Sequence, residues 1–321
     1  MRRRASPLAW GALVEALLLL GAPRAAHGAT PFDDPYDLPE APRPPTLPEL
    51  THRDIEATFE STVGAVYPKH AAAPGWTKPA GEYVQRLNVE VPLGLRRWFV
   101  GATYETAFGP DPLRGGPAKL VGGNLETYGR TVWATRTGLS FGGGMGLMFP
   151  VTAFDEGSPA SRVVAGGAAI RPWDFQFFEK DALTARPFID VRLLDGRFVV
   201  QFREGLDWSF IRGSATRSSL AAITALYVGY KFGEVLGVGL EAFELYFIEG
   251  QALDDARAYF AISPSLRIMT PVFQPCFSFV STIADPLYPP SSSAFAFRAA
   301  LTVLWDPTTR RIEADTRGKD Q

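Results

Sequence analysis

Side chains able to act as catalytic bases are scarce in this chain of 321 residues, which contains three histidines. His27 falls in an N-terminal leader described below, and His52 and His70 both precede the strong strand patterns. A hydrolytic centre needs a base within hydrogen-bond reach of a nucleophile. Neither histidine has a plausible nucleophile beside it in a strand, so both are interpreted as loop residues. We predict that the protein is not an enzyme.

Metal and cofactor sites are equally poorly supported. Cys276 is the only cysteine, and the acidic pairs at 33–34 and 254–255 are not followed by a spaced set of oxygen ligands. The glycines at 142–144 lie in a strand pattern and do not precede a helix, which argues against a phosphate-binding loop. They are interpreted as small residues that clear space or relax strand curvature. No cofactor is predicted.

The remaining candidates are charged side chains in segments where apolar residues alternate with polar or small ones. These charged side chains occupy the polar positions of the alternation, called the polar phase below. A period of two places successive side chains on opposite faces of a strand. If the apolar phase faces lipid, the polar phase lines a lumen. Seven basic and four acidic residues then point inward: Arg86, Glu90, Glu126, Arg130, Asp190, Arg192, Arg203, Glu241, Arg257, Arg267 and Arg298. Such a lining either favours small anions in a water-filled path or pairs internally and fills the barrel.

The elements that must position these charges are strands. The alternation is clearest in residues 256–268 and 295–305, and Asp195-Gly196 separates two alternating runs as a hairpin turn of type I′ would. Twelve segments follow the pattern: 84–93, 96–107, 122–133, 138–150, 162–171, 186–194, 197–206, 219–231, 235–248, 257–269, 273–284 and 294–305.

Two weaker segments, 55–66 and 173–180, leave the strand number open. Single-chain bacterial barrels have even numbers of strands with both termini on the periplasmic side, so the two segments are accepted or rejected together. The second could equally be a short helix that begins after Pro172. We predict an all-β fold, an antiparallel up-and-down transmembrane β-barrel of about 12 strands, with 14 as the alternative.

Alternation alone does not distinguish a lipid-facing surface from a packed core. A soluble barrel of twelve strands would be too wide for side chains to fill, and runs of 10 to 13 residues suit tilted spanning strands. Aromatic residues also lie near the ends of the runs, where membrane interfaces would be: Trp98, Trp133, Phe149, Tyr230 and Trp305. A soluble periplasmic β protein is the minority alternative.

The flanking segments predict export. Residues 1–28 combine three arginines, an apolar run and a small-residue cleavage site, as a signal peptide does. Residues 29–54 are rich in proline and are predicted to form a periplasmic lead-in. Residues 55–83 are assigned to a possible extra strand and a loop, residues 84–306 to the barrel, and residues 307–321 to a polar tail.

The pI near 6.0 argues against nucleic-acid binding.

The last strand carries the most specific motif: Arg298, Ala300, Val303 and Trp305. With this motif the chain resembles bacterial outer-membrane β-barrel proteins over roughly residues 84–305, although the family prefers glycine at position 300 and usually ends at the aromatic residue. The resemblance implies a location in the outer membrane, contact with its lipid, and recognition by the barrel-assembly machinery.

Two functions are compatible with this architecture. The first is a passive channel or transporter for small solutes. The second is a closed structural or surface-interaction barrel whose external loops bind a partner. The two differ in whether the lumen conducts, which the sequence does not determine.

Overall fold

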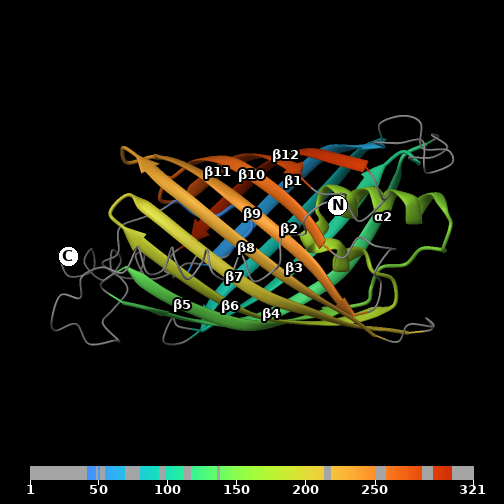
Figure 1. The fold of residues 1–321 in the computed structure, drawn as a ribbon, viewed down its shortest axis with the longest axis horizontal. Coiled ribbons are helices and arrows are strands. Elements are labelled where there is room, and N and C mark those ends of the chain that lie inside the picture. The colour runs from blue at the N-terminus through green and yellow to red at the C-terminus, as the bar shows by residue number, and fades with distance from the viewer. Residues whose placement is uncertain are drawn as a thin grey trace, which may run out of the picture.

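The computed structural model describes residues 42–47, 50, 55–68, 80–93, 98–111, 117–135, 138–212, 218–249, 258–283 and 292–305. Its twelve antiparallel strands form one closed barrel in which each strand pairs with its neighbours in sequence, and β1 pairs with β12 to complete the wall (Figure 1). The predicted fold class and strand number are therefore confirmed.

Most strands are longer than those of soluble sheets, as spanning a bilayer at a tilt requires. Their bounds are β1 Ile55–Pro68, β2 Ala80–Leu93, β3 Trp98–Gly109, β4 Lys119–Ala134, β5 Leu139–Phe149, β6 Ala182–Asp195, β7 Phe198–Ile211, β8 Ser218–Phe232, β9 Leu236–Glu249, β10 Ala258–Ile268, β11 Phe273–Thr282 and β12 Ser292–Trp305.

The two ends of the barrel differ in the length of their connections. The end at which β1 begins and β12 finishes, here called the turn end, has short connections such as Gly196–Arg197 between β6 and β7. The opposite end, here called the loop end, carries the longest connection, residues 150–181. The predicted hairpin is present, but Asp195 pairs with Phe198, so the turn is displaced by one residue and Gly196 has the positive φ of 56°.

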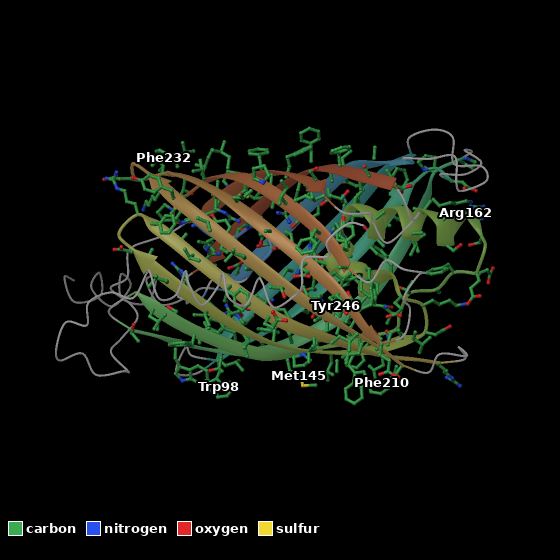
Figure 2. All side chains as sticks on the ribbon, in the orientation of Figure 1. Trp98, Met145, Arg162, Phe210, Phe232 and Tyr246 are labelled. Carbon is green, nitrogen blue, oxygen red and sulfur yellow. The ribbon has the colours of Figure 1, made fainter. Side chains whose placement is uncertain are left out.

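The apolar phase of the strands faces outward. Trp98 is 57% exposed, Phe297 70% and Leu301 40%, whereas their inward neighbours Arg298 and Thr302 are each 2% exposed. Figure 2 shows apolar side chains projecting from the wall along its length, with Trp98 near the turn end. The predicted facing is therefore confirmed in the described strands, and the outer surface matches one that contacts hydrocarbon.

The connection between β5 and β6 corrects the sequence prediction for residues 162–171. They form not a strand but most of helix α2, Pro159–Ile170, which is followed by the 3₁₀ helix η2, Pro172–Phe178. The helix starts at Ser158, whose side chain accepts a hydrogen bond from Ser161 N, with proline in the first turn. Among the described residues, no helix is long and apolar enough to cross a membrane.

The strand count is preserved because the weaker segment at 55–66 is a strand, β1, so the barrel starts at Ile55 instead of residue 84. The segment at 173–180 is mostly η2, in agreement with the helical alternative. The two weaker segments are thus not accepted or rejected together. One replaces the false strand at 162–171, and the total remains twelve.

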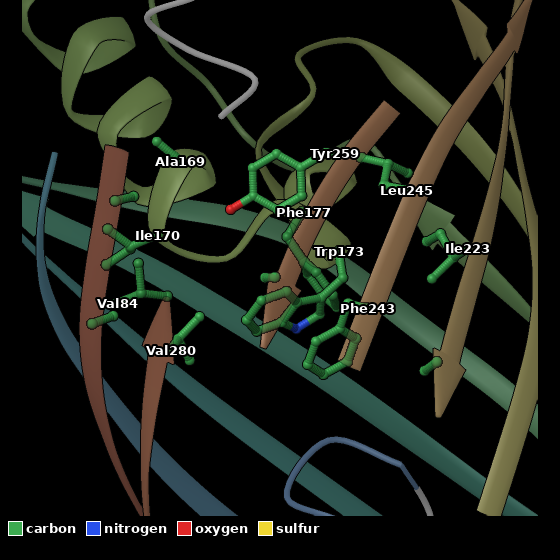
Figure 3. Close-up of a cluster of buried hydrophobic side chains, with 14 of the residues drawn as sticks. Val84, Ala169, Ile170, Trp173, Phe177, Ile223, Phe243, Leu245, Tyr259 and Val280 are labelled. Carbon is green, nitrogen blue, oxygen red and sulfur yellow. The ribbon is translucent and has the colours of Figure 1, made fainter. Parts of the chain in front are cut away.

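Helices α2 and η2 fold into the loop-end half of the lumen, where their apolar side chains pack against small and apolar inward residues of the wall (Figures 1 and 3). Trp173 stacks on Phe243 of β9 with ring centroids 4.2 Å apart and an interplanar angle of 12°. Ile170 and Phe177 are buried in the same cluster. This connection, residues 150–181, is called the insertion below, and it fills space that the wall side chains alone would leave open.

Part of the predicted periplasmic lead-in also lies inside the barrel. Most of residues 42–47, together with Leu50, are buried, and they are called the N-terminal segment below. Inward glycines make room for it. A Cβ atom at Gly237 would lie 3.0 Å from Pro42 Cβ, and one at Gly142 would lie 2.9 Å from Leu50 Cδ2. The glycine run of β5 therefore clears space in the lumen at Gly142, one of the two roles predicted for it.

Candidate functional site: a charged chamber inside the barrel

A chamber of about 150 Å³ lies within the lumen between the N-terminal segment and η2. Thr46 and Leu47 line it on one side, and Trp173 and Asp174 on the other. Among the residues that the structure describes, six arginines and six acidic residues contribute to the lining: Arg43, Arg86, Arg130, Arg186, Arg203 and Arg267, with Glu56, Glu60, Glu90, Glu126, Asp174 and Asp207. Apolar residues such as Phe188, Ile223 and Phe243 complete the lining. The many ionisable groups beside them suit water and hydrophilic solutes.

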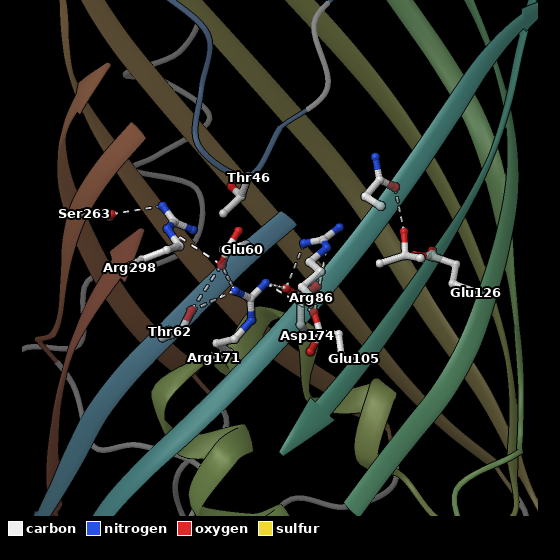
Figure 4. Close-up of polar contacts among 12 residues, drawn as sticks. Thr46, Glu60, Thr62, Arg86, Glu105, Glu126, Arg171, Asp174, Ser263 and Arg298 are labelled. Atoms are coloured by element: carbon white, nitrogen blue, oxygen red, sulfur yellow. Dashed lines mark hydrogen bonds and ion pairs between the residues drawn. The ribbon is translucent and has the colours of Figure 1, made fainter. Parts of the chain in front are cut away.

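The insertion is joined to the wall by a cluster of ion pairs centred on Arg171, which is 1% exposed (Figure 4). Its guanidinium donates to Glu60 of β1 and, over 2.6 Å, to Asp174 of η2. It also lies 3.3 Å from a carboxylate oxygen of Glu105 on β3. Arg86 of β2 reaches Asp174 at 3.3 Å. The cluster therefore ties one helix junction to three consecutive strands.

Arg171 and Asp174 of the insertion stay ionised for identifiable reasons. Burial by itself would raise the pKa of Asp174, but Arg86, Arg171 and Arg186 outweigh it and hold that pKa at about 2. Burial disfavours the charge of Arg171, yet the surrounding carboxylates raise its pKa above the ordinary value. Glu179 lacks such compensation, and burial raises its pKa. Arg171 and Asp174, which join the insertion to the wall, are thus both charged at neutral pH.

Arginines elsewhere on the chamber wall are held by carboxylates of nearby strands. Arg130 of β4 donates to both carboxylate oxygens of Glu90 at 2.7 and 2.5 Å. Arg203 of β7 does the same to Asp190 of β6, with both distances 2.8 Å. Bidentate pairs of this kind fix the guanidinium plane and neutralise the charge locally. These two arginines therefore add little net positive charge to the chamber.

Two further arginines each contact side chains of two other strands. Arg186 of β6 lies 2.9 Å from Asp207 and 3.2 Å from Glu126. Arg298 of β12 donates to Ser278 at 2.7 Å and lies 3.4 Å from Glu241. Both are thus held by side chains of other strands.

The structure places ten of the eleven predicted lumen residues inside the barrel, and Arg257 lies outside the described residues. Six of them line the chamber: Arg86, Glu90, Glu126, Arg130, Arg203 and Arg267. The other four are buried in the wall beside it: Asp190, Arg192, Glu241 and Arg298. In the predicted assembly motif, Arg298 and Ala300 point inward, while Trp305 is 53% exposed on the outer face. His52 and His70 lie outside the described residues.

Several chamber residues were not found from the sequence. Arg43 and Thr46 belong to the proline-rich segment, and Asp174 belongs to the insertion, so none of the three lies on a strand of the barrel. The Ser158-Pro159 start signal could have revealed α2, but nothing local indicated that it folds inward. Among the described residues, no group of three or more histidine, cysteine or acidic side chains is arranged to hold a metal ion.

No protein-family model and no curated protein matches this chain in sequence. Solved structures share its fold. An outer-membrane channel from Pseudomonas putida F1 matches with a TM-score of 0.58 and 12% identity, over 82% of this chain and 99% of that chain. The NanC porin matches with a TM-score of 0.51 and 10% identity, over 76% and 98%. The resemblance to outer-membrane β-barrel proteins is thus confirmed at the level of the fold.

Proposed function

We propose that the protein is an outer-membrane channel for small hydrophilic solutes and that the chamber lies on the solute path. The apolar exterior supports a location in the membrane, and the short connections of the turn end support its placement toward the periplasm. The chain carries out no catalysis in this proposal. Lipid and the barrel-assembly machinery are its implied partners, with the motif on β12 as the assembly signal.

The observation that carries the proposal is the polar chamber at the centre of a barrel whose exterior is apolar. A barrel that serves only as an anchor can fill its interior with apolar side chains, as the loop-end half of this one is filled. Charged groups at the centre are costly unless they are paired and hydrated. Their concentration around open volume therefore favours a hydrated path.

The N-terminal segment is the part best suited to open this path. Arg43 attaches it to Glu56 at 2.6 Å, and Thr46 donates a hydrogen bond to Glu241. The insertion, in contrast, is fixed by the buried cluster at Arg171 and by aromatic packing. We assign the N-terminal segment the role of a movable closure on the turn-end side and the insertion that of a fixed constriction.

A reversible cross-link tests this assignment. In a Cys276→Ala background, Leu50→Cys and Gly142→Cys would tie the N-terminal segment to β5, because a Cβ at 142 lies 2.9 Å from Leu50 Cδ2. We expect the purified protein to conduct in planar bilayers when reduced and to lose most of its conductance when oxidised. Each single-cysteine variant serves as the matched control and should not respond to oxidant.

The closed-barrel function is the second candidate, because both internal segments occupy the lumen in this structure. Absence of conductance from the natural chain and from the reduced cross-linked variant would favour it. Conductance that is unchanged by oxidation would support the channel function but would contradict the role of the N-terminal segment as its closure.

A further inference from the structure

Arg267 of β10 differs from the other arginines that line the chamber. It is 4% exposed, yet it forms no ion pair with a described carboxylate. Its Nε atom has no hydrogen-bond partner among the described residues. Its Nη1 atom makes one long contact, 3.4 Å, to Thr302 Oγ1. The guanidinium therefore presents unused donors at the chamber wall.

Arginine side chains in general carry a positive charge at any ordinary pH. A buried charge without a partner is strongly destabilising, so proteins rarely retain one unless a ligand compensates it. The five N–H donors of arginine form a planar fork that matches the two oxygens of a carboxylate. The missing partner is thus an oxyanion of that geometry.

The surroundings of Arg267 supply further polar contacts for such a group. Thr302 and Thr58 both line the chamber, and their hydroxyl oxygens lie 3.0 Å apart. The carboxylate of Glu56, which accepts a hydrogen bond from Thr58, is itself held by Arg43 at 2.6 Å, which reduces its repulsion of an incoming anion. A volume of about 150 Å³ admits a small organic acid.

We propose that Arg267, with Thr302 and Thr58, forms a binding subsite for the carboxylate of a small organic acid inside the chamber. The inference rests on the proposed channel function and gives its solute a chemical class, a small monocarboxylate. The fork of Arg267 takes both carboxylate oxygens. The Thr302 hydroxyl, which bonds to Thr58 in this structure, turns its hydrogen to the carboxylate, while Thr58 keeps its bond to Glu56. A neutral amide of the same shape lacks the charge that Arg267 requires.

Binding is measured on the full chain in detergent by saturation-transfer NMR, with propionate as the probe and propionamide as its neutral analogue. We expect a signal for propionate that is at least fivefold stronger than that for propionamide. Arg267→Gln should abolish this preference, and Arg267→Lys should retain part of it. Arg197→Gln, which removes the same charge from an exposed turn, is the matched control and should leave the preference intact.

Thermal unfolding provides a second measurement that does not require a conducting channel. Propionate should raise the unfolding midpoint of the natural chain, and Arg267→Gln should unfold at a higher temperature than the natural chain when no anion is present, because it removes an uncompensated charge. Equal signals for propionate and propionamide, or an undiminished preference in folded Arg267→Gln, would overturn the subsite. Anion binding without conductance would instead reject the channel and keep the subsite.

Discussion

Replacing Arg171 by glutamine should release the insertion from the barrel wall without unfolding the barrel. The side chain faces three carboxylates, those of Glu60, Glu105 and Asp174, and is 1% exposed. Removing one partner from a buried ion pair typically costs about 3–5 kcal/mol, because the charges left behind are uncompensated. Three carboxylates lose a contact, but the cost does not become three times as large, because Arg86 still lies 3.3 Å from Asp174.

A loss of about 3–5 kcal/mol corresponds to an increase of roughly 10²- to 4 × 10³-fold in the population of the released insertion. Limited proteolysis measures that population, since trypsin can cut after Arg162 or Lys180 when the insertion leaves the lumen. Strand pairing is untouched, so the shift in gel mobility on boiling should persist. We therefore expect faster cleavage within residues 150–181 of a folded barrel.

Lys180→Gln is the matched control in the same segment. Lys180 lies 3.9 Å from Asp181 in an exposed pair, and such pairs contribute about 0–1 kcal/mol. Its cleavage pattern should change only by loss of its own site. If Arg171→Gln were folded and its insertion were cut no faster than that of the natural chain, the cluster at Arg171 would not be what holds the insertion in place.

Three further expectations follow from the same structure. Phe297→Arg, at a site 70% exposed on the outer face, should cost about 2–4 kcal/mol and impair membrane assembly, whereas Phe297→Leu should assemble normally. Gly237→Val should displace the N-terminal segment, since a Cβ there lies 3.0 Å from Pro42 Cβ, and should raise bilayer conductance; Gly81→Val, with nothing within 4 Å, should leave conductance unchanged. The pKa of Asp174, about 2 in the folded protein, lies below its ordinary value, so its stabilisation is present above pH 4 and is lost as the pH falls toward 2. Cleavage of the insertion by pepsin should accelerate only as the pH approaches 2. Accelerated cleavage already at pH 5 would contradict the stabilising role assigned to Asp174.

The strands of the barrel wall were predictable because alternate residues face two different environments, the lipid outside and the lumen inside. Leu87 is 48% exposed on the outer face and Glu90 is 4% exposed inside, a contrast that membrane and lumen impose on every strand. The same signal is weaker where inward residues are small or apolar, as at Gly64 and Val66 of β1. That is why β1 was a weak candidate although it closes the barrel.

The sequence pattern at residues 162–171 predicted a strand instead of helix α2 for a physical reason. Its helix is buried on several sides inside the lumen, so Val163, Val164 and Ile170 are all shielded from water. A short apolar run of this kind does not reveal whether it is a buried strand or a buried helix. Two of the partners of Arg171, Glu60 of β1 and Glu105 of β3, precede it by more than sixty residues, and no local spacing encodes such contacts.

The inward-facing residues of the strands nevertheless indicate which part of the lumen is filled by protein and which part is hydrated. Along β12 it reads Ala294 and Ala296 near the loop end and then Arg298 at the centre, and along β3 it reads Glu105 and then Ala107 toward the loop end. All three alanines are buried in the apolar cluster that contains Trp173 and Phe177 of the insertion, whereas Arg298 and Glu105 belong to the polar cluster beside the chamber. A twelve-strand wall cannot fill its own interior with alanine, so small residues at consecutive inward positions require another segment to occupy the space. Charges at the next inward positions require water, a counter-charge or a ligand. The change from small to charged residues along a single strand therefore marks the boundary between the insertion and the chamber.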